Sequence, residues 1–221
     1  MSAYPVLYEV DYVEPRNRLT VFFRVLLAIP HMIVLYLLAV ALTFTVIAAW
    51  VAQVLTGRYP EGLYSFNAKA LRWLARVHGY LYLQVDRFPP FDLGEHPEYP
   101  VRMAFAGPLP KYSRAKALFR IIVAIPVMVI AYAMGVVYQL CAIAAWFVVV
   151  VMGRLPKGIF DGIELGMAYA IKAAAYLMLL TETYPPFSNE NATLEPVGAA
   201  GALGGGGFAP PRSSLPGGLE G

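Results

Sequence analysis

The sequence predicts an all-α membrane protein, a tandem repeat of two-helix modules with about four transmembrane helices. Of its 221 residues, 59% are hydrophobic and only 14% are charged, whereas soluble domains average roughly 45–50% and about 25%. Two apolar runs are too long to be hidden in the core of a chain of this size. Short motifs also recur at a fixed spacing, which indicates a duplication.

The duplication is visible in several motifs that recur 96 residues apart. Their first residues are 24 and 120 for Arg-x-x-x-Ala-Ile-Pro, 47 and 143 for Ile-Ala-Ala-Trp, 57 and 153 for Gly-Arg-x-Pro-x-Gly, and 86 and 182 for acid-x-aromatic-Pro-Pro-Phe. This spacing divides the chain into a first membrane module at 1–91, a linker at 92–98 and a second membrane module at 99–187. The Gly- and Pro-rich tail at 188–221 is expected to be disordered.

Each module begins with a short extended segment. Residues 4–12 alternate Tyr or Val with other residues, which is the period of a β-strand. The corresponding segment at 99–105 is shorter and its alternation is weaker. Because an isolated strand is not stable, we expect the two segments to pair with each other across the repeat.

A long apolar run follows each extended segment. In the first module it extends from Leu19 to Leu55 and would be about 55 Å long as one helix, against about 30 Å of hydrocarbon in a bilayer. Because proline breaks or kinks a helix, Pro30 predicts an interfacial lead-in helix at 17–29 and a transmembrane helix at 30–55. Pro126 predicts the same division in the second module.

A second helix returns in each module, at 63–85 and at 159–181. The second copy is apolar enough to span the bilayer, whereas the first is poorer and by itself fits an amphipathic surface helix. The repeat favours the same topology in both copies, and therefore four spans. Both modules would then share one orientation, related by a pseudo-two-fold axis along the membrane normal. The bias of Lys and Arg toward one side predicts a multi-pass protein of the bacterial inner (plasma) membrane with both termini cytoplasmic.

The residues that close each module carry a resemblance to a known family. Arg76-x-x-x-Tyr80 is followed by Asp86-Arg-Phe-Pro-Pro-Phe91, and Lys172-x-x-x-Tyr176 by Glu182-Thr-Tyr-Pro-Pro-Phe187. These closures, with the Arg-x-x-x-Ala-Ile-Pro motif, resemble a bacterial membrane-protein family catalogued only as a domain of unknown function. The resemblance covers residues 4–187 and implies a multi-pass membrane protein with a duplicated module. It implies no catalytic or binding residues.

Motifs of enzymes are missing from the sequence. It contains no His-Glu-x-x-His, Gly-x-Ser-x-Gly, P-loop or dinucleotide-binding fingerprint. His31, His78 and His96 lie in unrelated contexts without a second ligand at metal spacing, and the lone Cys141 fits a small buried hydrophobe. We therefore expect no catalytic residues, no cofactor and no metal, and the scattered cations argue against nucleic acid as a partner.

Charges inside the apolar regions give the candidate site, a polar intramembrane cluster on the two return helices. Its members are Lys69, Arg72, Arg76, Asp161, Glu164 and Lys172. The first three share a helix face, and the acids of the second copy lie at a similar depth. Three readings stay open: the charges pair as a lock between modules, the cations line an anion or lipid-headgroup site, or they snorkel to the interface.

The other candidate residues are lipid-headgroup anchors, namely Arg24, Arg120, Trp50 and Trp146. The expected partners are the bilayer, with its anionic lipids, and either other membrane proteins or further copies of the chain. The favoured function is a non-enzymatic scaffold or accessory subunit of a membrane complex. The alternative is a small transporter or a lipid- or anion-binding protein with a cavity at the module interface.

Overall fold

Two repeated, mainly helical modules make up the computed structural model, which describes residues 4–13 and 16–187. The predicted tail at 188–221 lies outside the described residues. In the first module the elements are β1 (Val6–Val10), α1 (Arg18–Phe22), α2 (Arg24–Thr56) and α3 (Glu61–Leu81). In the second they are β2 (Val101–Phe105), α4 (Arg114–Leu118), α5 (Arg120–Met152) and α6 (Lys157–Leu177).

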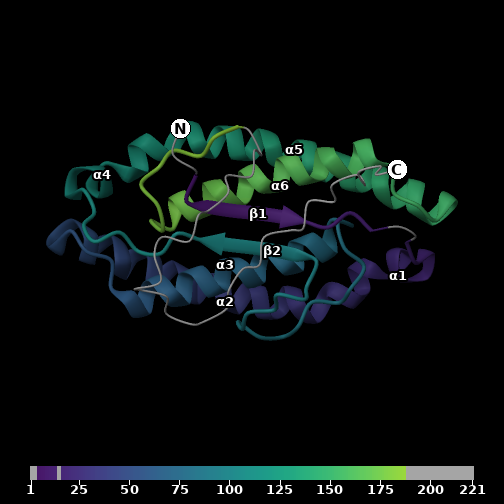
Figure 1. Cartoon of the computed structure of the whole chain (residues 1–221), viewed down its shortest axis with the longest axis horizontal. Helices are drawn as coiled ribbons and strands as arrows, with labels where there is room; N and C mark the ends of the chain where they lie inside the picture. Colours follow the sequence, from purple (N-terminus) through teal and green to yellow (C-terminus); the bar gives the residue numbers. More distant parts are fainter. Residues whose placement is uncertain (1–3, 14–15, 188–221) are drawn as a thin grey trace, which may run out of the picture.

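The two strands pair across the repeat, as the alternation of residues predicted. β1 and β2 are antiparallel, and Tyr8 lies opposite Met103 at the centre of the sheet. These two residues occupy equivalent positions in the modules, so a pseudo-two-fold axis passes between them, perpendicular to the sheet. The long helices α2 and α5 therefore run in opposite directions, and α1 and α4 lie at opposite ends of the molecule (Figure 1).

The sheet covers the inner pair of helices. Among the described elements the strands contact only α3 and α6, while α2 packs on α3 and α5 packs on α6. At Gly79 of α3 an added Cβ would lie 2.7 Å from Val101 Cγ2, so β2 crosses α3 where a side chain would not fit. Figure 1 shows the strands in front of the helices, with α2 and α5 along the two long edges.

The helix break that Pro30 was predicted to cause lies instead at Phe23, between α1 and α2, and Pro30 lies inside α2. The backbone of Phe23 departs from helical geometry at φ −90° and ψ 6°, and the corresponding Phe119 separates α4 from α5. Asn17 caps α1, since its side chain accepts hydrogen bonds from the Leu19 and Thr20 amides. The lead-in helices are thus five residues long, and Pro30 and Pro126 are accommodated in continuous helices.

The return helices end four residues earlier than predicted, at Leu81 and Leu177. The chain reverses at Leu83 and Leu179, whose φ angles of 60° and 64° are left-handed. Residues after Leu83 then run back along α2. The Pro-Pro-Phe closures therefore follow a sharp reversal and do not themselves stop the helices.

Two helices of the described chain, α2 and α5, are long and apolar enough to cross a membrane. The prediction of four spans is corrected to two candidates, because α3 and α6 carry charged residues and bury one face against the sheet and the other against the long helices. In the most apolar stretch of α2 and of α5 only 11% of the residues are buried. At the middle of these helices, Tyr36 is 72% exposed and Tyr132 is 77% exposed.

Candidate functional site

Trp50 and Trp146, predicted as lipid anchors, each donate a hydrogen bond from one module to the other. The Trp50 indole Nε1 donates a hydrogen bond to the Ala117 carbonyl of α4 at 2.9 Å, and Trp146 Nε1 donates to the Val21 carbonyl of α1 at 3.2 Å. The two bonds are equivalent under the pseudo-two-fold. Each long helix thereby holds the lead-in helix of the other module, and both indoles are partly buried.

Arg24, the other kind of predicted anchor, is buried inside the first module. Its guanidinium donates to the Tyr80 carbonyl at 2.8 Å, to the Val85 carbonyl at 3.1 Å and to the Asp86 carboxylate. The same group lies over the Tyr80 ring, 4.7 Å from its centroid. Arg24 therefore satisfies one carbonyl in the last turn of α3 and one in the segment after it, and is not free to reach lipid headgroups.

Arg120 repeats this arrangement in the second module with fewer polar partners. Its guanidinium donates to the Thr181 carbonyl at 3.1 Å and lies 4.0 Å from the centroid of the Tyr176 ring. The acid that corresponds to Asp86, Glu182, accepts instead from the Ser113 amide at 2.6 Å and lies 3.6 Å from Lys116. The headgroup role predicted for Arg120 is likewise replaced by an internal one.

The basic face of α3 is occupied by the linker that follows it. Arg72 pairs with Glu95 at 2.6 Å, and Arg76 donates to the carbonyls of Asp92 and Gly94 at 3.1 and 3.0 Å. Burial lowers the pKa of Arg76, and the nearby Asp92 carboxylate opposes that shift. Lys69 is exposed.

The charged side chains of α6 lie apart from the basic face of α3. Asp161 is exposed, and Glu164 is partly buried, close enough to the sheet to raise the pKa of Tyr8 together with burial. Lys172 is 4% exposed, its ammonium lies 5.8 Å from the centroid of the Tyr4 ring, and burial lowers its pKa. The lock predicted between the modules is therefore not formed by Arg72, whose carboxylate partner is Glu95.

An aromatic cage around His31 escaped prediction. The imidazole is 1% exposed, stacks on Phe91 with 3.7 Å between centroids, and donates through Nε2 to the Pro89 carbonyl at 3.1 Å. Trp73 Nε1 donates to the Pro90 carbonyl at 2.8 Å. The Pro-Pro-Phe segment thus packs between α2 and α3. The presence of His31 in an apolar run was the only signal of this cage in the sequence.

A further group of titratable side chains lies on the linker at 92–98. His96 Nε2 lies 2.8 Å from Asp92 Oδ1, and its Nδ1 lies 3.2 Å from Glu98 Oε1, on the exposed linker. Within residues 4–13 and 16–187, no three His, Cys, Asp or Glu side chains are placed to hold a metal ion. Cys141 is a free thiol, partly buried between α5 and α6.

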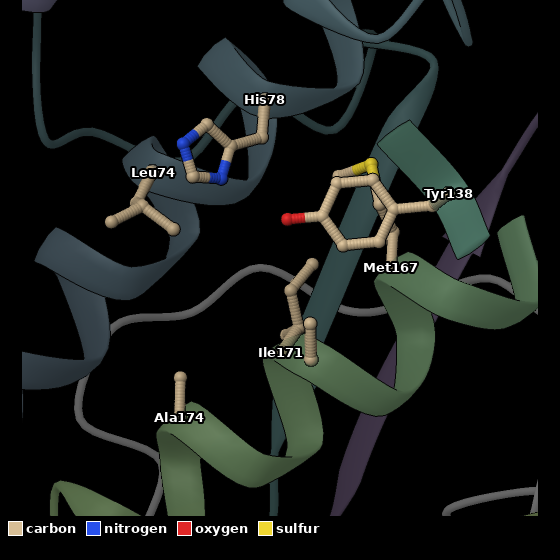
Figure 2. A pocket seen from close by; sticks show the side chains of 7 residues that line it. Leu74, His78, Tyr138, Met167, Ile171 and Ala174 are labelled. Carbon is tan, nitrogen blue, oxygen red and sulfur yellow. The ribbon is translucent and has the colours of Figure 1, made fainter. Parts of the chain in front are cut away.

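A cavity of about 180 Å³ lies where the two modules meet. Leu74 and His78 of α3 line it, together with Tyr138 of α5 and four residues of α6 that include Ala170 and Ala174. Figure 2 shows the rings of His78 and Tyr138 directed into the space between the helices. Enclosure by neighbouring atoms lowers the pKa of His78 to about 4, so its imidazole is neutral at pH 7.

Comparison with known proteins identifies the repeat. A family model described as "Domain of unknown function (DUF4389)" matches residues 18–92 and again residues 114–189, more than half of the chain. The two matches begin 96 residues apart, which confirms the duplication. No curated protein and no solved structure matches the chain.

Proposed function

The chain belongs to the DUF4389 family, and we propose that it is an integral membrane protein acting as a non-enzymatic scaffold or accessory subunit of a membrane complex. The observation that supports this function is the exposed apolar surface of α2 and α5. Large side chains such as Leu37 at 62%, Phe44 at 68% and Ile121 at 68% stay exposed after folding. A surface of this extent is covered in a stable protein, and lipid is the cover that these two helices fit.

In the orientation that we propose, the molecule lies flat in the membrane. The helices α2 and α5 are parallel to the bilayer plane and lie inside one leaflet. The outer face of the sheet carries Glu9 and Arg102, 3.5 Å apart, and Arg102 also pairs with Asp11 at 2.6 Å. This face belongs in water. The sheet covers the inner helices α3 and α6, and the apolar helices α2 and α5 pack on these inner helices. The sheet side of the molecule therefore suits water, and the side formed by α2 and α5 suits lipid.

A spanning orientation fits the same structure less well. The pseudo-two-fold axis passes through the sheet, so aligning α2 and α5 with the membrane normal would place Glu9 and Arg102 at mid-bilayer. A charge there costs roughly 2.5–3.5 kcal/mol or more, and open strand edges are not found in contact with lipid. The 33-residue length of α2 corresponds to about 49 Å, which exceeds the hydrocarbon thickness but is unrestricted in the bilayer plane.

The flat orientation also assigns surfaces to the expected partners. Exposed cations stand at both ends of the long helices, namely Arg18, Arg58, Arg114 and Arg154. These ends meet the headgroup region, where anionic lipids attract Lys and Arg. The charged sheet face and the linker at 92–98 remain in water as the surface offered to a protein partner. Arg72 and Arg76 are already engaged by the linker, which favours the scaffold over an anion site at that position.

A depth profile along α2 tests the membrane orientation. Leu26, Leu37 and Leu55 are 61%, 62% and 68% exposed and lie on one stripe of the helix. Each is replaced by cysteine in a Cys141→Ala background, spin-labelled, and its depth in phosphatidylglycerol-containing nanodiscs is measured by power saturation. We expect three equal depths within the hydrocarbon, and Glu9→Cys should report water. A profile deepest at Leu37 and shallow at the other two would establish a spanning helix.

Native mass spectrometry of the protein, extracted from its own membrane into nanodiscs, tests the scaffold role. A second protein retained in fixed stoichiometry is the expected result. Charge reversal on the sheet face, in Glu9→Lys and Asp11→Lys with Arg102→Glu, keeps both ion pairs but inverts their polarity and should release that partner. A chain that is always recovered alone would contradict the scaffold.

A further inference from the structure

We propose that the cavity between α3, α5 and α6 binds the acyl chain of a membrane lipid. This inference rests on the membrane location proposed above and adds a specific ligand site to it. The cavity of about 180 Å³ resembles in size the engineered apolar cavity of about 150 Å³ that accepts benzene. It therefore suits a chain segment of about six carbons.

The cavity arises from a difference between the two modules. Leu74 of α3 corresponds to Ala170 of α6, and His78 corresponds to Ala174. All four residues line the space. Equivalent helices meet here near the pseudo-two-fold, but at these two positions only α3 carries large side chains, while α6 adds Met167 and Ile171 from neighbouring positions. The two alanines leave empty the volume that a symmetrical pair of helices would fill.

The position of the cavity makes lipid the accessible ligand. On α3, Arg72 and Gly79 contact the strands, whereas Leu74 and His78 lie on a face turned well away from them. The cavity thus opens away from the charged sheet and beside α5, one of the two helices proposed to lie in lipid. An acyl chain of the surrounding leaflet would reach it without crossing water.

His78 gives the apolar cavity a polar position in addition to the Tyr138 hydroxyl. Among the described residues, no hydrogen bond engages the ring nitrogens of His78, although its ring contacts that of Tyr82 with 5.7 Å between centroids. A neutral imidazole can donate one hydrogen bond and accept another. The ester carbonyl of a lipid would accept that hydrogen bond while its chain fills the space toward Ala174, which distinguishes a lipid from a plain hydrocarbon.

Photocrosslinking with phosphatidylglycerol that carries a diazirine in its acyl chain tests the site in liposomes. Labelled peptides are identified by mass spectrometry. In the unaltered protein we expect labels on α2 and α5, from bulk lipid, and on the cavity-lining part of α3 and α6. Filling the cavity with Ala170→Leu and Ala174→Leu should lower the α3 and α6 labels at least about tenfold and leave unchanged the labels on α2 and on the part of α5 away from Tyr138. Ala133→Leu, on the exposed side of α5, is the matched control and should change neither.

Leu74→Ala gives an independent result should the filled variant not fold. It enlarges the cavity, and the labels on α6 should increase. Labels on α2 and α5 without any on α3 and α6, or cavity labels unaffected by filling and by enlargement, would overturn the acyl-chain site alone. Absence of labels on α2 and α5 would overturn the membrane location proposed for the protein.

Discussion

The two modules hold their helix pairs together by different means. The difference lies at three positions that are equivalent in the two copies. In the first module, Thr45 donates to Asn67 Oδ1 and Asn67 Nδ2 donates to the Tyr59 hydroxyl, each at 2.7 Å. The second module has only apolar or weakly polar side chains at these positions, namely Cys141, Ile163 and Leu155. A hydrogen-bonded network in one copy is thus replaced by hydrophobic packing in the other.

The second module compensates with closer contact between its helices. An added Cβ at Gly166 would lie 2.8 Å from Tyr138 Cβ and 3.0 Å from the Met134 carbonyl oxygen. The corresponding residue of the first module is Ala70. The comparison shows that one backbone fold tolerates two solutions, polar bonds between α2 and α3 and close packing of small residues between α5 and α6. The modules should therefore differ in which substitutions they tolerate.

The largest effect is expected from Gly166→Leu, because the new side chain meets backbone atoms of α5 that cannot move independently. We expect the protein to lose about 3 kcal/mol of stability or more, measured by thermal unfolding in detergent. Gly158→Leu is the matched control on the same helix, since nothing lies within 4 Å of its Cβ position. Equal losses from both substitutions would show that close packing of α5 and α6 does not stabilise the second module.

The buried arginines should give the next largest difference. Arg24→Met removes the donors to Tyr80 and Val85 and the main cation beside Asp86, at a cost of about 2–3 kcal/mol, reduced because Asp86 keeps a contact with Arg16. Arg120→Met removes one hydrogen bond and a ring contact, and should cost about 1 kcal/mol. Unfolding temperatures of the two variants in one detergent provide the measurement, and an equal or reversed order would contradict the assigned roles.

The repeat, the pairing of the strands and the helical class could be predicted because they depend on residue order alone. Motif spacing showed the duplication, and alternation between Tyr4 and Tyr12 showed the strand. The break at Pro30 was wrong: α2 begins at Arg24, whose guanidinium contacts the end of α3, some 56 residues away in the chain. No local pattern carries that contact.

The candidate site was less predictable for a related reason. Arg24, Trp50 and their counterparts have the composition of lipid anchors, yet each finds a backbone carbonyl in another element. Arg72 pairs with Glu95 of a linker whose path depends on the left-handed Leu83. The cavity depends on Ala170 and Ala174 meeting Leu74 and His78 across the pseudo-two-fold. This relation becomes visible only when the two copies are placed in space.

His78 gives a pH-dependent test of the module interface, since Ala174 replaces it in the second copy. Its pKa is lowered to about 4 in the folded protein and should be about 6.5 when unfolded. Between these values the unfolded state binds more protons, so stability is full above pH 6.5, falls as the pH drops toward 4, and changes no further below it. The full shift corresponds to about 3 kcal/mol, and because the imidazole is only partly buried and solvent screens it, we expect a loss of about 2 kcal/mol over this range. His78→Gln should remove that part of the pH dependence, and an unchanged slope would show that the imidazole is not enclosed as described.

The smallest effect concerns the polar network itself. Asn67→Ile alone introduces the residue of the second module but leaves the Thr45 and Tyr59 hydroxyls with one partner fewer, and should cost about 1–2 kcal/mol. Adding Thr45→Cys and Tyr59→Leu removes those hydroxyls and reproduces the second module's set. We expect this triple variant to regain part of the loss, because it leaves no unpaired hydroxyl or amide of the network, although the Met178 carbonyl loses the hydrogen bond from the Tyr59 hydroxyl at 3.1 Å. Thermal unfolding of the single and triple variants tests this expectation. If the triple variant is less stable than the single one, the hydrogen bonds hold the first module together, rather than the packing between α2 and α3.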